Sequence, residues 1–496
     1  MLSITEIKQF IEEDATSEKK LRAKVGQKYY EGNHDINSYK IWYYNADGVM
    51  VEDTTRSNVK ISHAFFTELV DQGTQYILSG DGEFIKSDNP ALQAELDKYF
   101  NDDEDFIAEL SEALTGCQAK GFEYMFAYKN AEDRIAFQCA DSMGVVEVRA
   151  KDTDSNTEHM IYWYIDRIEK GKKKIKRIQV WDDKEVYFYV QDGEGNIELD
   201  ASAAINPKPH TLYKKPGSGK TYYDKFGFIP FFRLDNNKKQ VSNLSGIKSL
   251  IDDYDIMACG LSNNIQDASE YLVVAEGFQG DMEALMQNTR TKKHIGVDEG
   301  GSIDFKTVDI PHEARMAKLE LDEKNIYRFG FGLNLSGLKD TSATTNIAIK
   351  AAYSLLDLRC AKLEIRLKQF LRKLIKVVLD EINTVNGTDY QMNQVYFNFE
   401  HEIMSNAQEN AQVELIEAQR KNMEITTLLN LAAHLDDETL MQLICDELDI
   451  DYEEIKNKLP DPEEAANAVK DAQGVLNNVV VEGEQAAEGN SATVLG

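Results

Sequence analysis

The chain has 496 residues, of which 42% are hydrophobic, so it is long enough for two to four domains with substantial cores. Its 86 acidic residues outnumber the 55 basic ones and give a formal net charge of -31. This charge disfavours tight non-specific binding of nucleic acid, because contacts to phosphates need a surplus of Lys and Arg.

The five cysteines are scattered and show no CxxC spacing, so they predict neither a disulfide framework nor a zinc site. No run approaches the roughly 20 consecutive apolar residues of a membrane span. The first residues, MLSITEIKQF, lack the apolar segment of a signal peptide. We therefore expect a protein that is made inside the cell and has no membrane partner.

Helices are expected over the first 120 residues. Ser3 and Glu6 have the spacing of a capping box, and Asn89-Pro90 is a favourable helix start. From these signals and from apolar residues at helical spacing we predict a helix near the start, followed by helices over 21–30, 56–80, 89–100 and 105–120.

The pattern changes to short alternating runs rich in aromatic and β-branched residues between 122 and 234, which predicts an antiparallel β region. The basic run EKGKKKIKR, residues 169–177, falls where two of these strands would turn. We interpret it as a solvated hairpin tip rather than a nucleic-acid patch, because no aromatic residues alternate with the lysines.

Two helical segments, an insert and one very long helix follow. The pattern predicts a helix over 245–271, a compact insert over 278–311, and a second helix that starts after Pro311 and ends near Gly330 and Gly332. A small, polar segment, NLSGLKDTSATTN, leads into a helical pattern over 345–383 that contains no Gly or Pro. These roughly 39 residues would form a rod about 58 Å long. Its apolar stripe consists of Ile349, Leu356, Leu363, Leu367, Phe370, Leu374, Val378 and Ile382.

The last hundred residues predict a strand over 394–402 and helices over 406–434, 436–445 and 452–458. After Pro460 the composition is rich in Ala, Glu, Asn and Gly, and we expect a mobile acidic tail.

Signals for chemistry are weak. Gly219-Lys220-Thr221 resembles the end of a phosphate-binding loop, but the first glycine of that motif is replaced by Lys214. Asp252, Asp253 and Asp255 point in different directions on a helix, and we interpret them as a solvated face rather than as metal ligands. The eight histidines are dispersed. We predict no catalytic residue, no metal site and no cofactor.

Three blocks, RSNVKISHAFFTELVDQGTQYILSG, GIKSLIDDYDIMACGLSNNIQDASEYLVVAEGF and FGFGLNLSGLKDTSATTNIAIKAAYSLLDLRCAKLEIRLKQFL, resemble the portal proteins of tailed bacteriophages, in the SPP1-type group from phages of Gram-positive bacteria. The resemblance covers most of residues 1–460 in order. It implies an α+β portal fold with a helical stem, a β-containing wing and clip, a long spine helix and a helical crown.

The family's parts map onto this sequence as a wing over 1–240, a stem helix over 241–277, a clip over 278–310, a second stem helix over 311–332, a tunnel loop over 333–346, the spine helix and a wing return strand over 347–404, a crown over 405–460 and the acidic tail over 461–496. By resemblance, DNA would face the tunnel-loop residues Ser336, Gly337, Leu338, Lys339, Asp340 and Thr341. The docking residues of the clip would include Arg290, Lys292, Lys293 and His294.

The resemblance also implies a ring of about twelve identical subunits at one capsid vertex of the virion, assembled in the host cytoplasm. Its partners would be double-stranded DNA, the terminase motor, a head-completion adaptor, and the major capsid and scaffolding proteins. An acidic wall would avoid trapping DNA, and Lys339 would supply weak, replaceable phosphate contacts. The alternative hypothesis is an intracellular nucleotide-dependent enzyme that uses the partial phosphate loop around Lys220.

Overall fold

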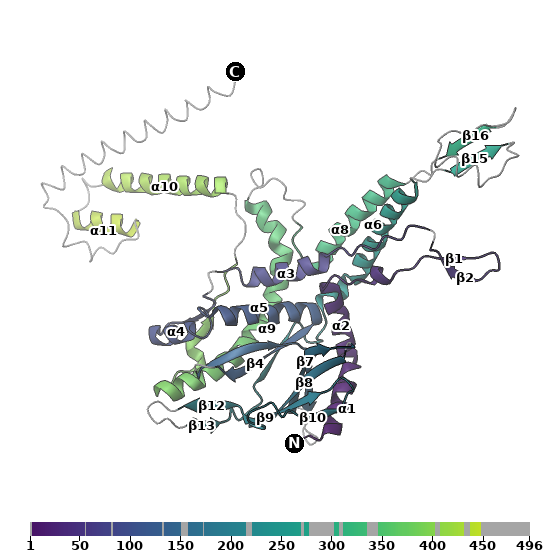
Figure 1. Cartoon of the computed structure of the whole chain (residues 1–496). Helices are drawn as coiled ribbons and strands as arrows, with labels where there is room; N and C mark the ends of the chain where they lie inside the picture. The colour runs from purple at the N-terminus through teal and green to yellow at the C-terminus, as the bar shows by residue number, and fades with distance from the viewer. Residues whose placement is uncertain are drawn as a thin grey trace. The chain divides into compact units, whose positions relative to one another are not determined.

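A computed structural model describes residues 2–401, apart from 55, 81–82, 131–132, 150–156, 172, 215–220, 269–271, 277–301, 307–310 and 335–345, and also describes 407–430 and 437–447. The chain divides into two compact units, one of residues 1–340 with 347–404 and one of residues 341–346 with 405–496. Figure 1 labels the elements, and each unit is described separately below.

The N-terminal helices of the first unit begin at the expected capping residues. Ser3 and Glu6 form a capping box at the start of α1, and Asn89 and Asp103 cap α4 and α5. Gly121 ends α5 with a φ of 100°, a left-handed conformation that favours glycine. The helices are α1 (Ile4–Ala15), α2 (Glu18–Tyr30), α3 (Phe65–Ile77), α4 (Pro90–Asp97) and α5 (Glu104–Lys120).

One of these helices is shorter than expected. The pattern over 56–80 predicted a helix ending at Gly80, whereas α3 begins at Phe65 and ends at Ile77. That prediction was wrong for residues 56–64. The apolar spacing on which it depended begins at Phe65, and residues 57–63 instead run along another helix, α6 (Lys248–Ala268).

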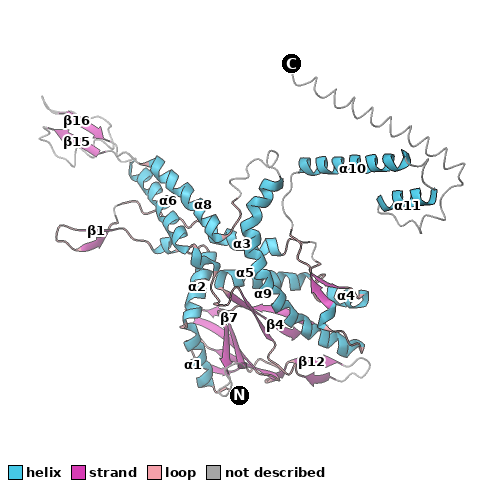
Figure 2. Cartoon of the chain, turned by 180° about the vertical axis from the view of Figure 1, so that it is seen from behind, coloured by secondary structure: helices cyan, strands magenta, loops and turns pink. Residues whose placement is uncertain are grey.

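The β region is antiparallel throughout its described pairs, as expected. One sheet has the order β14 (Phe231–Asp235), β4 (Phe122–Lys129), β5 (Ile135–Ala140). A second has the order β10 (Ile197–Leu199), β9 (Glu185–Gln191), β8 (Lys173–Trp181), β7 (Thr157–Glu169), β6 (Val145–Arg149), with β11 (Lys208–Pro209) also paired to β9. Figure 2 shows these strands together with the helices around them.

The basic run 169–177 lies at the β7–β8 hairpin, where Glu169 pairs with Lys173 across the turn. Its position as a hairpin tip is therefore confirmed. The remaining two-stranded pairs are β1 (Trp42–Tyr44) with β2 (Met50–Glu52), β3 (Ile85–Ser87) with β17 (Val395–Phe397), β12 (Thr211–Lys214) with β13 (Thr221–Asp224), and β15 (Leu272–Glu276) with β16 (Ser302–Lys306). Short 3-10 turns occupy Asp35–Ser38, Asn243–Gly246 and Met392–Gln394.

The long helix α9 (Asn346–Asn386) has 41 residues, a length of about 62 Å. Its predicted apolar stripe is confirmed wherever side chains are described: each member is at most 4% exposed and lies in the largest core, with side chains from α4, α5, β4 and β5. Those members are Leu356, Leu363, Leu367, Phe370, Leu374, Val378 and Ile382. The helix is therefore the central support of the first unit.

The second unit contains α10 (Ala407–Asn430) and α11 (Asp437–Glu447), which pack against each other. They correspond to two of the helices expected in this part of the sequence. The helix expected over 452–458 and the acidic tail lie outside the described residues. Together the two units confirm the α+β class.

Candidate functional site

The feature most distinctive of this chain is a helix pair formed by α6 (Lys248–Ala268) and α8 (His312–Gly330), which pack side by side (Figure 1). The second helix begins and ends within a residue of the expected bounds. The first is shorter than the helical segment expected over 241–277, because residues 272–276 form β15 and pair with β16. In the chain, the strand pair β15 and β16 therefore lies between the two helices, and β16 falls within the expected insert.

Aromatic and ionic contacts hold the helix pair together and join it to α3. Phe65 of α3 contacts Tyr254 of α6 and Tyr327 of α8, with ring centroids 4.8 and 5.9 Å apart. Lys318 of α8 reaches Asp253 of α6 at 2.6 Å and also pairs with Asp322. The ring contacts therefore join all three helices near the end of α8, and the ion pair joins α6 and α8 near the middle of α8.

The glycines that end α8 have a packing role. A Cβ atom at Gly332 would lie 2.0 Å from Cδ2 of Leu69, and one at Gly330 would lie 2.6 Å from Cδ1 of the same side chain. Leu69 is buried in the core shared by α3, α6 and α8. The two glycines therefore allow the end of α8 to approach α3 closely.

Side chains from α3 and α9 hold the end of α8 and the residues that follow it. The side-chain amide of Gln72 donates to the carbonyl oxygen of Leu333 at 2.9 Å and its oxygen accepts from the Leu333 amide at 3.0 Å. From α9, Arg359 donates to the carbonyl oxygens of Gly330 and Leu69 at 3.1 and 2.6 Å. The Arg359 guanidinium is a favourable cation at the C-terminus of α8.

The predicted DNA-facing residues, Ser336 to Thr341, fall in 335–345 and lie outside the described residues. So do the predicted docking residues Arg290, Lys292, Lys293 and His294. The structure describes what flanks each set: Asn334 and α9 on either side of the first, and the paired strands β15 and β16 on either side of the second. Their roles stay predictions.

An extended segment, which we call the strap (residues 57–63), runs along α6. The backbone amides of His63, Ile61, Val59 and Ser57 donate to the side chains of Asp255, Cys259, Asn263 and Asp267 at 3.0, 3.3, 2.7 and 3.2 Å. Alternate residues of an extended chain are about 6.6 Å apart, and every fourth residue of a helix is about 6.0 Å apart. The two repeats match closely enough for four successive hydrogen bonds.

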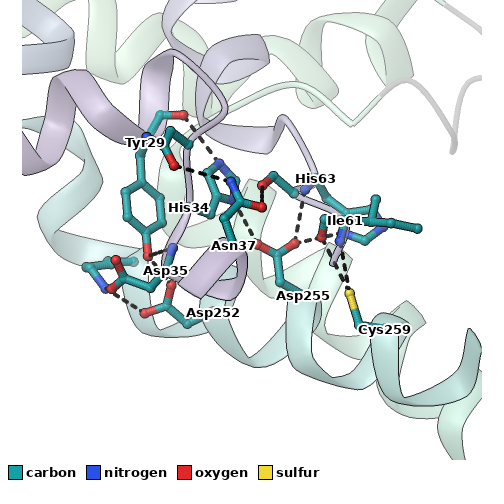
Figure 3. Close-up of polar contacts among 12 residues, drawn as sticks. Tyr29, His34, Asp35, Asn37, Ile61, His63, Asp252, Asp255 and Cys259 are labelled. Atoms are coloured by element: carbon teal, nitrogen blue, oxygen red, sulfur yellow. Dashed lines mark hydrogen bonds and ion pairs between the residues drawn. The ribbon is translucent and has the colours of Figure 1, made fainter. Parts of the chain in front are cut away.

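Asp255 is the buried end of this ladder, and Figure 3 shows it between two histidines. Its side chain is 0% exposed, and its oxygens accept from Nδ1 of His34 and Nδ1 of His63, each at 2.7 Å. Burial by itself would raise the pKa of Asp255, but the hydrogen bonds from both histidines outweigh it and lower the pKa. Asp255 thus joins the N-terminal helices, the strap and α6.

A second polar set lies one turn earlier on α6. Lys248 contacts Asp35 and Asp252, each at 2.7 Å, and Tyr29 donates its hydroxyl to Asp252. The hydrogen bond from Lys248 is the main cause that lowers the pKa of Asp35 to about 2. The ring of Tyr29 stacks on His34 at 4.5 Å, which connects the two polar sets.

The sequence interpretation was wrong for Asp255 and correct for Asp253. Asp253 is half exposed, whereas Asp255 is buried and has two histidine partners that come from positions 34 and 63. The histidines looked dispersed because the fold, not their spacing, brings them together. One signal was available: Asp255 lies four residues from Ile251 and four from Cys259, both buried, so it falls on the buried stripe of α6.

The phosphate-loop hypothesis requires a helix directly after Lys220, and the structure has a strand at that position. Residues 215–220, including Lys220, lie outside the described residues, and Thr221–Asp224 forms strand β13 paired with β12. A phosphate-binding loop places phosphate at the N-terminus of the helix that follows it. Elsewhere, the described residues hold no group of three or more His, Cys, Asp or Glu arranged for a metal ion. Their helices include none that is both long and apolar enough to span a membrane.

Comparison with known proteins identifies the class. Residues 9–459 match the family described as "Phage portal protein, SPP1 Gp6-like". The chain therefore belongs to this family of phage portal proteins, which are structural components of the virion and not enzymes.

The chain is similar in sequence to two portal proteins of other phages. The chain is 26% identical over 349 residues to the portal protein of Bacillus phage SPP1, a match that covers 70% of this chain and 67% of the relative. It is 26% identical over 407 residues to the portal protein of Clostridium phage phiCD119 (strain Clostridium difficile/United States/Govind/2006), covering 76% of this chain and 85% of the relative. The family implies a homo-oligomeric ring at a capsid vertex of the virion.

Proposed function

We propose that about twelve copies of this chain form a ring that conducts double-stranded DNA during packaging and ejection. The observation that carries the proposal is the family match over residues 9–459. The ring would be assembled in the host cytoplasm together with the scaffolding and major capsid proteins.

We assign the parts of the ring as follows. The wing is 1–240 with the return strand, the stem is the α6–α8 pair, the clip is the insert with β15 and β16, and the tunnel loop is 333–346. The spine is α9, the crown is 405–460 and the tail is 461–496. The separation of residues from 405 onward into a second compact unit supports the crown boundary.

The tunnel loop is proposed as the segment that meets DNA. Its anchors are described: Gln72 holds Leu333, and Arg359 connects α9 to the last carbonyl of α8. Lys339 is the single Lys or Arg between 334 and 346. The loop of each subunit would therefore present one basic residue to DNA, whereas the chain as a whole has a net charge of -31.

The test for the loop is DNA translocation by preassembled rings. Lys339→Ala is expected to leave ring formation intact and to lower the rate or the processivity of packaging. Lys184→Ala, which removes an exposed lysine from the turn between β8 and β9, is the matched control. Packaging by Lys339→Ala at the rate of the control would remove this residue from the mechanism.

The clip is proposed as the docking site for terminase and later for the head-completion adaptor. Its basic residues Arg290, Lys292, Lys293 and His294 lie between β15 and β16 in the chain, and this strand pair lies between α6 and α8. Lys292→Glu with Lys293→Glu should weaken terminase binding at least tenfold while rings persist. Lys173→Glu with Lys174→Glu, on exposed positions of β8, is the control. Equal terminase affinity for both double variants would refute the assignment.

The nucleotide-dependent enzyme is not retained. Family membership and strand β13 both argue against it. Lys220→Ala is accordingly expected to leave ring assembly and packaging unchanged.

A further inference from the structure

The β1–β2 hairpin is exposed on both faces. All six of its strand residues are exposed, among them Trp42 (51%), Tyr44 (72%) and Met50 (53%). Figures 1 and 2 both show the hairpin standing clear of the other labelled elements. Among the described residues, no third strand pairs with either of its edges. We call residues 39–53, which contain this hairpin, the arm.

Such an exposed hairpin is expected to pack against a partner. A two-stranded hairpin alone is marginally stable in water, and clustered exposed apolar side chains mark interaction surfaces. The arm is nevertheless well formed. Lys40 pairs with Glu52 at 2.6 Å across its base and lies over the ring of Trp42 at 5.8 Å, and the Asn45 side chain accepts from the amides of Asp47 and Val49 in the turn. It is preorganised for a contact that the described part of the single chain does not supply.

The arm is also fixed at its base. The strap that follows it is held to α6 by the four-rung ladder, and Asn58 of the strap donates to the carbonyl oxygen of Tyr39 at 3.3 Å. The arm therefore has a defined direction relative to the helix pair. A partner that covers it would be connected mechanically to α6.

A complementary surface lies on α8. Ala314, Ala317, Leu321, Lys324 and Arg328 are all exposed and follow one another at spacings of three and four, so they form one face of the helix. This face, which we call the α8 face, is apolar toward its start and basic toward its end. The arm carries the matching properties, aromatic and aliphatic side chains together with Asp47 in its turn; Glu52 and Asp53 at its base already pair with Lys40 and Arg56.

We propose that the arm of each chain docks on the α8 face of the adjacent copy in the ring. The occupant is a second copy because a closed ring needs two different complementary surfaces on every subunit, and the arm and the α8 face have complementary apolar and charged groups. The inference rests on the ring proposed above. Its consequence is that each helix pair is bound to its neighbour by a segment anchored to α6.

The experiment measures ring dissociation of the full chain by mass photometry over a dilution series. Tyr44→Ser with Met50→Ser, and separately Leu321→Ser, should each raise the concentration at which rings dissociate at least tenfold. The combined variant should be less affected than the product of the two, because both remove the same contact. Leu199→Ser, which removes an exposed leucine from β10, is the control and should shift the concentration less than twofold.

A cross-link identifies the partner surface. Tyr44→Cys in one chain and Leu321→Cys in a chain of different tag length should form a mixed disulfide-linked pair on oxidation of the assembled rings. Rings that resist dilution equally with and without the arm substitutions would refute the docking while leaving the ring intact. A wild-type chain that stays monomeric would contradict the ring itself, and the docking with it.

Discussion

Replacement of Asp255 by Asn tests the role of the buried carboxylate. The side chain is fully buried and accepts hydrogen bonds from two imidazole nitrogens and from the backbone amide of His63. Asn has the same size, but its terminal NH2 group donates hydrogen bonds and would face a group that also donates. Hydrogen bonds to charged groups contribute about 1.5–3 kcal/mol each, and the Asp255 carboxylate accepts three of them. We expect the free energy of unfolding to fall by about 3–5 kcal/mol.

The effect should depend on pH in a defined direction. The pKa of Asp255 is lowered in the folded protein, because hydrogen bonds outweigh the effect of burial. A carboxylate of this kind stabilises the fold above its unfolded pKa of about 3.9, and the contribution is lost as pH falls through the lower folded pKa. The difference between wild type and Asp255→Asn should therefore be constant near neutral pH and shrink below about pH 4.

The assay is urea unfolding followed by far-ultraviolet circular dichroism, at one fixed chain concentration because assembly also contributes to stability. Asp253→Asn is the matched control. Its carboxylate is 48% exposed and pairs with Lys318, so its loss should cost less than about 1 kcal/mol. Equal losses for the two variants at pH 7 would refute the reasoning about Asp255.

Three further predictions concern α9 and its surroundings. Leu374→Ala, in the fully buried stripe, should cost about 2–5 kcal/mol, whereas Ile365→Ala, at an exposed position, should cost less than about 0.5 kcal/mol in the same urea assay. Arg359→Met leaves two backbone carbonyls without their donor and should lower stability by about 2–4 kcal/mol; an unchanged urea midpoint would contradict its role as an anchor. The hydrogen bond to Glu364 raises the pKa of His401, so its contribution is complete below the unfolded pKa of about 6.5 and is lost as pH rises through the folded value. His401→Gln should accordingly be less stable than wild type by about 1 kcal/mol at pH 5 and approach it above neutral pH, and a difference independent of pH would exclude this titration.

The sequence predicted best those elements whose apolar residues repeat regularly. The stripe of α9 was predicted correctly, because this helix buries one continuous set of side chains in one core. Strand β4 was also located, but its first six residues are all buried, since its apolar side chains enter two different cores in alternation. Residues 56–64 were assigned to a helix because the apolar pattern beginning at Phe65 was extended backward into them. Their conformation depends on a ladder to α6, which lies about 200 residues later in the chain and leaves no local signal.

The candidate site was only partly predictable from the sequence. The helix pair and the anchored segment after α8 were located from periodicity and glycines, and the family was recognised from three blocks. The buried cluster at Asp255 was missed, since His34 and His63 meet it only through the tertiary fold. Ile265 has the apolar spacing of α6 but is exposed, and beyond Asp255 the helix uses Cys259, Asn263 and Asp267 to hold the strap. The roles of Lys339 and the clip residues stay predictions.

The ladder between the strap and α6 restricts how this protein can change length. One residue inserted in α6 after Asp255 would turn Cys259, Asn263 and Asp267 by about 100° away from their partners. The ladder could be restored by inserting four residues in the helix together with two in the strap, because those lengths match. Insertions and deletions in these two segments should therefore occur as coupled changes in related chains, although the segments are separated by nearly 200 residues.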